Sequence, residues 1–404
     1  MKLLHTSDWH LGRMLYSKKE RREEHSAFLN WLQATIKENL VDLLIVAGDI
    51  FDTASPSSSS QKMYYDFLLN VRNSGCLNVV IVGGNHDSPS FLNAPKDILA
   101  ALNVHVIGNA SENIDDEIVV IRDNEDCPVA VVCAVPFLRE RDISRFTEGE
   151  TYQNRSMRIA ESIKNHYEKI AEMAENKRNE LGKNIPLIAT GHLSVAGGKK
   201  NEDDGVRDIY IGNIECVGSE IFSQSFDYIA LGHYHVPSVI SEKVRYCGSP
   251  IPMGFGEAGQ QKCVYIVDFK EKKTLIETVE IPVFQKLESI RGDKSFIENR
   301  LTELKDSDIS VWVEIIYDGN EVFPDFTAWT AEKTVDTKIE ILKLQNRQYL
   351  ANVLTQNDSI QPLEELNEFD VFDKLLEKNG ISTEQKEELK NLYRNVVVEL
   401  NIEN

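Results

Sequence analysis

The sequence lacks any long apolar run. None of its 404 residues lies in a stretch that approaches the ~18 apolar residues a membrane helix needs. The first residues, Met1 to His5, carry no signal-peptide hydrophobic region, and ligand-type side chains appear from Asp8 onward. We therefore expect no membrane association and a cytoplasmic location.

Cysteine is sparse and never occurs as a C-x-x-C pair. The six cysteines are spread over the chain, whereas a secreted disulfide scaffold would be smaller and denser in cysteine. This distribution favours reduced, buried or half-buried thiols.

Positive charge is also scarce, because 44 Lys and Arg face 65 Asp and Glu for a net charge of −21. Such a chain is a poor general DNA binder by itself, since DNA is bound largely through Lys and Arg contacts to phosphate. A nucleic-acid substrate would require local basic patches, metal ions or a partner. The most basic window runs from Arg13 to Arg22 with Glu20 as its single acid. It is either a substrate-facing patch or a solvated loop and helix start.

A phosphate-binding loop of the G-x-x-x-x-G-K-[ST] type is absent as well. The chain is therefore not expected to bind ATP by that route.

The first part of the sequence alternates between apolar runs and helical patterns. Strands are predicted at 2–7, 43–47 and 79–82, separated by helices at 22–40 and 59–73. This order indicates a parallel sheet with crossover helices, in which ligands gather past the carboxyl ends of the strands. Asp8, Asp49 and Asn85 each follow such a strand end.

The later sequence predicts further strands at 118–122, 129–135, 186–190 and 227–231, with a long helix at 152–181. Residues 244–281 alternate like antiparallel strands and close a catalytic domain, 1–281. A small α+β unit follows at 282–345, with a helix at 294–305 and a strand at 309–317. We expect a linker at 346–367 and a helical hairpin at 368–404, which has two apolar faces.

Five short fragments carry residues typical of a metal site. They are Asp8-Trp9-His10, Gly48-Asp49-Ile50-Phe51-Asp52, Gly84-Asn85-His86-Asp87, Gly191-His192 and Gly232-His233-Tyr234-His235. In an extended segment, residues two apart point to the same side, so each paired fragment can aim two ligands into one pocket. Each fragment alone occurs often by chance. Five of them, each after a predicted strand or in a glycine-bounded turn, favour a single metal site.

The ligand types suggest two divalent cations. We assign Asp8, His10, Asp49 and His235 to the first, and Asp49, Asn85, His192 and His233 to the second, with Asp49 bridging the two. Imidazole, carboxylate and amide together suit Mn, Fe, Co or Zn better than calcium. A bridging water would then attack phosphorus in line.

His86 follows a ligand and can face the substrate without binding metal. We expect it to stabilise the transition state or protonate the leaving oxygen, with Asp87 orienting its ring. His5 is predicted to be structural or to support a ligand. The remaining histidines, His25, His105 and His166, are predicted to be surface or packing residues.

These motifs resemble the calcineurin-like metallophosphoesterase superfamily, a two-layered β-sandwich flanked by helices. Three stretches narrow the resemblance to the SbcD family of bacterial nuclease subunits: Thr6 to Gly12, Glu24-His25 at a helix start, and Ala47 to Thr53. Gly248-Ser249-Pro250 fits the same family. The resemblance is specific over 1–260 and looser beyond, and it covers the domain order.

The resemblance implies a Mn²⁺-dependent, ATP-stimulated 3′–5′ double-strand exonuclease and single-strand or hairpin endonuclease. Its substrates would be DNA ends and hairpins in repair, recombination and replication. It also implies an SMC-type ATPase partner, SbcC, bound through the C-terminal hairpin, and a homodimer within a heterotetramer. That hairpin could alternatively pack on its own domain. Relatives often carry histidine where this chain has Asp52, which leaves the role of Asp52 open.

Two other functions fit parts of the pattern. A phosphomonoesterase or phosphoprotein phosphatase would share the core, but protein phosphatases usually follow the G-D-x-x-D motif with Arg-Gly, and here Thr53-Ala54-Ser55-Pro56 follows. A non-catalytic scaffold protein would show degraded ligands, whereas all seven are present together with His86.

Overall fold

The computed structural model describes residues 1–144, 149–182, 184–199, 217–270, 273–305, 307, 309–319, 321, 323, 325–346 and 389–390. The chain divides into two compact units, one of residues 1–316 with 327–345 and one of 317–326 with 346–404. The predicted linker and C-terminal hairpin lie outside the described residues, except for 346 and 389–390. In the described part, no helix is long and apolar enough to span a bilayer.

The first unit is built on two six-stranded sheets. The first sheet has the order β14-β13-β1-β4-β5-β6. Its strands are β1 (Lys2–Thr6), β4 (Leu43–Ala47), β5 (Asn78–Val82), β6 (Val104–Ile107), β13 (Cys263–Lys270) and β14 (Lys273–Glu280). β1, β4, β5 and β6 run parallel, while β13 joins β1 antiparallel and pairs with β14 in a hairpin.

The second sheet has the order β11-β12-β10-β9-β8-β7. Its strands are β7 (Ile118–Arg122), β8 (Pro128–Cys133), β9 (Leu187–His192), β10 (Tyr228–Gly232), β11 (Ser238–Val239) and β12 (Val244–Tyr246). β8, β9, β10 and β12 are parallel. The two edge strands, β7 and β11, pair antiparallel.

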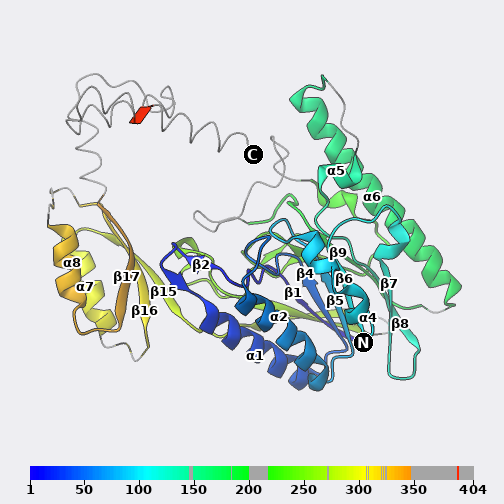
Figure 1. Cartoon of the computed structure of the whole chain (residues 1–404), viewed down its shortest axis with the longest axis horizontal. Helices are drawn as coiled ribbons and strands as arrows, with labels where there is room; N and C mark the ends of the chain where they lie inside the picture. The colour runs from blue at the N-terminus through cyan, green and yellow to red at the C-terminus, as the bar shows by residue number, and fades with distance from the viewer. Residues whose placement is uncertain are drawn as a thin grey trace. The chain divides into compact units, whose positions relative to one another are not determined.

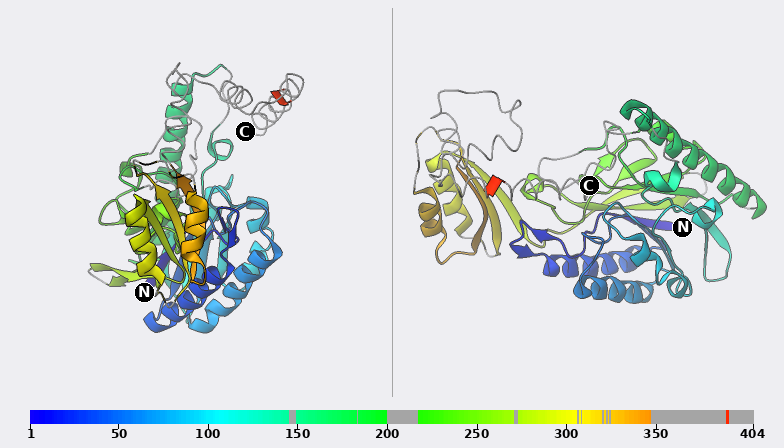
Figure 2. Two further views of the ribbon diagram at one scale, coloured as in Figure 1. Left: turned by 90° about the vertical axis from the view of Figure 1, so that its left-hand side faces the viewer. Right: turned by 45° about the horizontal axis from the view of Figure 1, so that its top comes forward.

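The two sheets face each other across an apolar layer and carry helices on their outer faces (Figures 1 and 2). Buried residues of both sheets meet between them: Leu3, Ile45, Val80, Val132, Ile188 and Ala230. The outer face of the first sheet packs on α1 (Arg22–Asn39) and α2 (Ser58–Val71), and that of the second on α6 (Tyr152–Glu180). Because both faces of each sheet are covered, the central strands are continuous apolar runs.

Shorter helices fill the connections. They are α3 (Pro89–Asn93) and α4 (Lys96–Ala100) before β6, and α5 (Glu140–Ile143) before α6. Short 3₁₀ turns occur at Arg72–Ser74, Ile114–Glu117, Ser219–Ile221 and Phe255–Glu257.

A three-stranded sheet, ordered β15-β16-β17, follows β14 along the chain. Its elements are β15 (Lys286–Gly292), α7 (Lys294–Lys305), β16 (Val311–Tyr317), α8 (Phe326–Thr334) and β17 (Ile339–Asn346). Leu287, Trp312 and Leu342 of this sheet pack with Leu15 and Phe255. Leu15 belongs to the small hairpin of β2 (Met14–Leu15) and β3 (Lys19–Glu20), so this sheet contacts the segment directly after His10.

The fold class predicted from the sequence is confirmed, and most strands and helices begin and end within a few residues of their predicted bounds. Of the strands predicted as antiparallel within 244–281, β13 and β14 pair antiparallel with each other, and β12 pairs antiparallel with β11 but parallel with β10. The sequence pattern also did not predict β6, because its alternating burial is brief and its neighbours are short helices.

Candidate metal centre

The five sequence fragments converge because five parallel strands end beside them. Asp8, Asp49 and Asn85 follow β1, β4 and β5, which are adjacent in the first sheet. His192 ends β9, and His233 follows β10, its neighbour in the second sheet. Carboxyl ends of parallel neighbours share one edge, so the packing of the two sheets brings both edges together.

Backbone hydrogen bonds join these fragments. Asp8 N–H donates to Gly48 O at 2.9 Å, and His10 N–H donates to Asp49 O at 3.0 Å. The Asp8 carboxylate accepts from His233 N–H at 2.9 Å, which links the two sheets. Asp8, His10, Asp49 and His233 all have positive φ, between 46° and 104°, a conformation that is uncommon for residues other than glycine. Such backbone strain tends to persist at functional sites.

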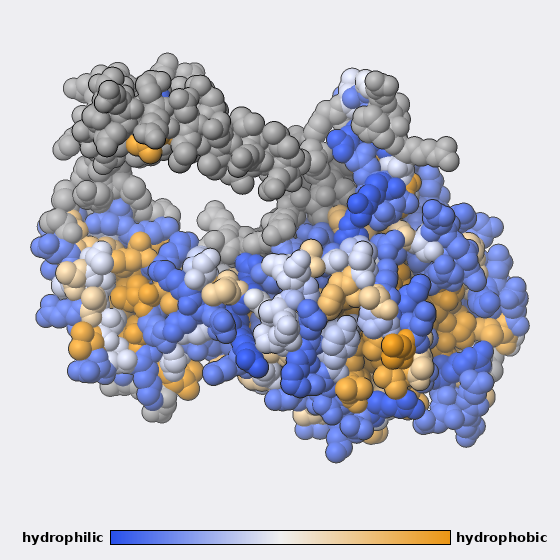
Figure 3. Space-filling view, in the orientation of Figure 1, coloured by the Kyte–Doolittle hydropathy of each residue, from blue (hydrophilic) through white to orange (hydrophobic). Residues whose placement is uncertain are grey.

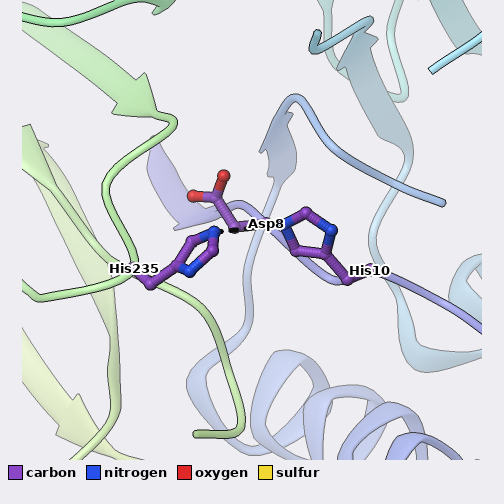
Figure 4. Close-up of side chains that lie close together, drawn as sticks. All are labelled: Asp8, His10 and His235. Carbon is purple, nitrogen blue, oxygen red and sulfur yellow. Dashed lines mark hydrogen bonds between the residues drawn. The ribbon is translucent and has the colours of Figure 1, made fainter. Parts of the chain in front are cut away.

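Asp8, His10 and His235 form the first group, with one ligand-type atom from each lying within 4.8 Å of the others. All three are almost completely buried. Figure 4 shows the rings of His10 and His235 meeting beside the Asp8 carboxylate. Their Nε2 atoms are 3.2 Å apart.

The neighbours of these two rings indicate that each Nε2 faces the other with a lone pair. His10 Nδ1 lies 3.3 Å from the Asp52 carboxylate, and His235 Nδ1 lies 3.6 Å from that of Glu257. A carboxylate beside Nδ1 favours the proton on that nitrogen, leaving Nε2 as the acceptor. Two lone pairs at this distance repel unless a cation or proton lies between them. The donor set therefore fits a divalent cation.

Asp8, Asp49 and His192 form a second group of the same dimensions. His192 Nε2 lies 3.3 Å from Asp49 Oδ2 and 2.9 Å from Asn85 Oδ1, while its Nδ1 lies 3.0 Å from Ala47 O. A proton on Nδ1 donated to that carbonyl leaves Nε2 facing the carboxylate and the amide oxygen. The ring of His233 meets that of His192 edge-on at 5.4 Å. All seven predicted ligands thus lie where the carboxyl ends of the parallel strands of the two sheets meet.

The electrostatics of the centre also suit a cation. Burial raises the pKa of Asp8 to about 6. Burial alone would lower the pKa of His192, but the Asp49 carboxylate beside it raises that pKa to about 9. Burial lowers the pKa of His10 to about 4. The buried carboxylates therefore draw positive charge into the site, and a metal ion can supply it in place of a proton.

The structure places His86 at the centre but gives Asp87 a different role from the predicted one. His86 Nδ1 lies 2.8 Å from the backbone carbonyl of Asp52, and His86 N–H donates to Asp49 Oδ1 at 2.9 Å. Asp87 accepts instead from Ile50, Phe51 and Gly84 N–H at 2.9–3.1 Å. The prediction that Asp87 orients the His86 ring is wrong. A carboxylate that accepts three backbone N–H groups holds the loop after β4 against the turn after β5.

His86 also forms a group with His10 and Asp49 within 4.8 Å. The ring of His86 meets that of His10 edge-on at 4.8 Å between centroids. The His86 ring therefore lies beside His10 and Asp49, and it is well placed to reach a phosphodiester bound at the metal centre.

The sequence did not predict the contacts that support the ligands, although it marked Asp52 as a residue of open role. Ser7 Oγ donates to Asp8 Oδ2 at 2.5 Å. Asp52 lies 3.3 Å from His10 Nδ1, and its interactions with His10 and Arg13 hold the pKa of the Asp52 carboxyl below the usual range despite burial. Buried Glu257 lies behind His235, and buried Lys262 forms an ion pair with Glu257 and donates to His235 O at 2.9 Å. Glu257 and Lys262 follow the Gly248-Ser249-Pro250 stretch in the sequence, but their spacing from His235 does not predict that they contact it.

The basic window is largely engaged in structural contacts. Arg13 pairs with Asp52 at 3.0 Å, and Lys18 donates to Leu342 O at 2.6 Å. Lys19 pairs with Glu340, and Arg21 is buried against Glu24. The window therefore connects the loop after β1 to the three-stranded sheet, and the interpretation of it as a substrate-facing patch loses its support.

The remaining histidines lie outside the three groups. His5 is buried with its ring nitrogens 2.9 Å from Tyr228 OH and 3.2 Å from Leu231 O, as a structural role predicts. His25 is a buried residue of α1, His105 is half-buried on β6, and His166 lies 2.8 Å from Glu117.

Comparison with known families matches two segments of the chain. The profile described as "Calcineurin-like phosphoesterase" matches residues 1–237. The profile described as "Type 5 capsule protein repressor C-terminal domain" matches residues 283–380. The first match contains every candidate ligand.

Curated relatives extend the similarity to nearly the whole chain. The SbcD subunit of the nuclease SbcCD of Escherichia coli K12 is 36% identical over 97% of this chain and 97% of its own length. The proteins of the same name are 35% identical in Rhodobacter capsulatus, over 66% of each chain, and 32% identical in Bacillus subtilis, over 67% of this chain and 66% of its own.

Proposed function

This chain belongs to the SbcD family of calcineurin-like phosphoesterases and is a metal-dependent phosphodiesterase of the nuclease type, and from that premise we propose how it works. We propose that it cleaves DNA at a centre of two Mn²⁺ ions. The observation that carries the proposal is the convergence of buried carboxylates and imidazoles, with Asp49 and Asp8 each shared between groups.

In this proposal Asp8, His10, Asp49 and His235 hold one cation, and Asp49, Asn85, His192 and His233 hold the other. When bound, two divalent cations acidify a water for in-line attack on phosphorus and neutralise developing charge. The chain itself supplies rigid ligands. Asp52 and Glu257 orient the His10 and His235 rings, and the Ala47 carbonyl orients His192.

His86 is the candidate catalytic residue of the chain. Its Nδ1 faces the Asp52 carbonyl, and we assign the contact with the substrate to its other ring nitrogen, Nε2. There it would donate to a phosphoryl oxygen or protonate the leaving oxygen. Asp87 acts indirectly, by fixing the Asn85-His86 turn to the loop that carries Asp49.

We further propose ATP-stimulated 3′–5′ exonuclease activity on duplex ends and endonuclease activity on single strands and hairpins, in cytoplasmic DNA end processing for repair, recombination and replication. Residues 1–281 form the nuclease domain, 282–345 a capping domain, 346–367 a linker and 368–404 a hairpin that binds an SMC-type ATPase, SbcC. A partner accords with the net charge of −21, which disfavours DNA binding by the chain alone.

A homodimer within a heterotetramer completes the proposal. Leu69 of α2 and Ile98 of α4 are exposed apolar side chains, at 61% and 74%, beside the nuclease core. Figure 3 shows a hydrophobic patch around α4, one of several on this face. Such a patch suits contact with a second copy.

The test is degradation of 5′- and 3′-labelled duplex and hairpin DNA with Mn²⁺. Wild type, His86→Gln and the matched control His105→Gln are compared with and without an SbcC-type ATPase and ATP. We expect His86→Gln to lose about 10²–10⁴-fold in rate, as removal of a general acid or base does. His105→Gln retains activity, because His105 lies outside the centre.

Stimulation by the ATPase with ATP and release of nucleotides from 3′ ends are the expected outcomes. Equal digestion by wild type and His86→Gln would contradict the role of His86. Hydrolysis of small phosphoesters with no cleavage of DNA under any metal would contradict the proposed substrate.

A further inference from the structure

Arg139 lies on a segment that reaches the edge of the metal centre from the second sheet. It follows β8, the parallel neighbour of β9, so it leaves the sheet at the edge where His192 lies. Phe137 N–H donates to Gly83 O at 2.8 Å, which fixes this segment beside the turn carrying Asn85 and His86. The ring of Phe137 meets that of His192 edge-on at 6.5 Å.

The guanidinium group of Arg139 is held in place on one side. Its Nη2 donates to the Asp87 backbone carbonyl at 3.1 Å, one residue after His86. Its central carbon lies 5.5 Å from the centre of the Phe137 ring. These two contacts hold a planar cation between the His86 turn and the His192 side of the centre.

The other side of the group has no protein partner in the described part of the chain. Arg139 Nη1 is buried and makes no hydrogen bond there, and no carboxylate of a described residue lies within ion-pair distance of Arg139. Burial lowers the pKa of the guanidinium, while Asp142, Asp87 and Asp49 act in the opposite direction and Arg141 adds to the lowering. An arginine stays protonated under these conditions. A buried donor on a charged group without an acceptor is costly and calls for a ligand.

Other arginines near the centre are neutralised by the protein. Arg13 pairs with Asp52 and Arg21 with Glu24, and on the far side of the segment Arg155 and Arg158 pair with Glu140. Arg13 also has a buried Nε without a hydrogen-bond partner, but Arg139 differs in its position and in having an unbonded Nη1 with no carboxylate pair in the described part of the chain. A guanidinium with a free planar edge suits a phosphate oxygen.

We propose that Arg139 binds a backbone phosphate of the DNA strand beside His86 and so positions the strand at the metal centre. The inference rests on the proposed nuclease function and adds a substrate-binding residue to it. It also supplies local positive charge that an acidic chain requires where a polyanion enters. The scissile phosphate and a neighbouring phosphate would both accept hydrogen bonds from Arg139. The test therefore uses one substrate that has neighbouring phosphates and one that has none.

The test compares wild type with Arg139→Gln, Arg139→Lys and the control Arg141→Gln. Arg141 is a suitable control because its side chain is 77% exposed and pairs with Asp142 at 3.5 Å. Steady-state cleavage is measured with Mn²⁺ on a duplex and on bis(4-nitrophenyl) phosphate, a phosphodiester without neighbouring phosphates. The increase in melting temperature caused by Mn²⁺ is measured for every variant.

For Arg139→Gln we expect the KM for DNA to rise about 10- to 100-fold, the range typical of a charged hydrogen bond. Arg139→Lys recovers part of the loss, and Arg141→Gln behaves like wild type. In a His86→Gln background, Arg139→Gln should reduce the slope of log binding constant against log salt by about 0.9, as loss of one phosphate contact does. Loss on both substrates assigns Arg139 to the scissile phosphate, and loss on DNA alone assigns it to a neighbouring phosphate.

An unchanged KM and salt slope would overturn the proposal. A reduced Mn²⁺-induced rise in melting temperature would also overturn it, because Arg139 would then act by holding the Asp87 turn. If Arg139→Gln does not fold, Arg139→Lys is judged by the same criteria. Failure of wild type itself to cleave DNA would instead contradict the proposed function.

Discussion

Single residues at the centre adopt conformations that residue identity alone could not predict. The seven ligand candidates and His86 were named from type and spacing, and the structure brings them to one edge. The positive φ of Asp8, His10 and Asp49 comes instead from hydrogen bonds between loops of different strands. These hydrogen bonds form only once the strands have packed together, so the sequence pattern could not predict them.

The role of Asp87 also depends on tertiary hydrogen bonds that the sequence could not predict. Its position after His86 suggested a carboxylate–imidazole pair, but its carboxylate is taken up by three backbone N–H groups. Adjacent residues in a tight turn often point apart, and here the loop after β4 offers donors that compete for the carboxylate.

The buried pair of Glu257 and Lys262 gives a prediction for stability. Lys262→Met should lower the free energy of unfolding by about 3–5 kcal/mol, because it leaves Glu257 buried without its cation. The control Lys270→Met removes a 60% exposed side chain paired with Asp268 and should cost about 0–1 kcal/mol. Urea unfolding measures both.

The double variant Glu257→Gln, Lys262→Met removes both charges and should recover much of that loss. A Lys262→Met protein as stable as wild type would contradict the account of this pair.

At the scale of elements, the strand ends were predictable because their signals are local. Apolar runs closed by glycine marked β4, β5 and β10, and the carboxyl-edge rule placed their ligands together. The packing of one sheet against the other was not predictable from periodicity. Strands that are buried on both faces are continuous apolar runs, so no alternation of apolar and polar residues shows which face packs on the second sheet. It entered the prediction only through the family resemblance.

The turn after β5 provides a prediction about the metal centre. A Cβ on Gly84 would overlap the Asp49 carboxylate and backbone, so Gly84→Ala should displace the proposed bridging ligand. We expect it to abolish the Mn²⁺-induced rise in melting temperature and to cost about 1–3 kcal/mol of stability as overpacking does. Calorimetry with and without Mn²⁺ measures both effects.

Gly75→Ala is the matched control for this substitution. Gly75 has a φ of +93° but no heavy atom within 4 Å of an added Cβ, so the substitution strains the backbone without reaching the centre. Its Mn²⁺-induced shift should equal that of wild type. Retention of the full shift in Gly84→Ala would show that Asp49 is not positioned by this turn.

At the scale of the whole molecule, an acidic chain presents a buried cluster of carboxylates and imidazoles at the junction of its sheets. The net charge of −21 and the engaged basic window leave little positive charge near the centre to attract DNA. Cations in the centre, Arg139 at its edge and an ATPase partner would together overcome this. The sequence predicted the need for such help but not Arg139, which no motif marks.

The measurement that tests the central claim most directly is anomalous scattering at the manganese edge from crystals of the full chain grown with Mn²⁺. The account predicts two peaks about 3.5–4 Å apart, the separation typical of two-metal phosphoesterases, with the Asp49 carboxylate between them. One peak should contact Asp8, His10 and His235, and the other Asn85, His192 and His233. A single peak, or a pair that does not share Asp49, would contradict the two-metal centre.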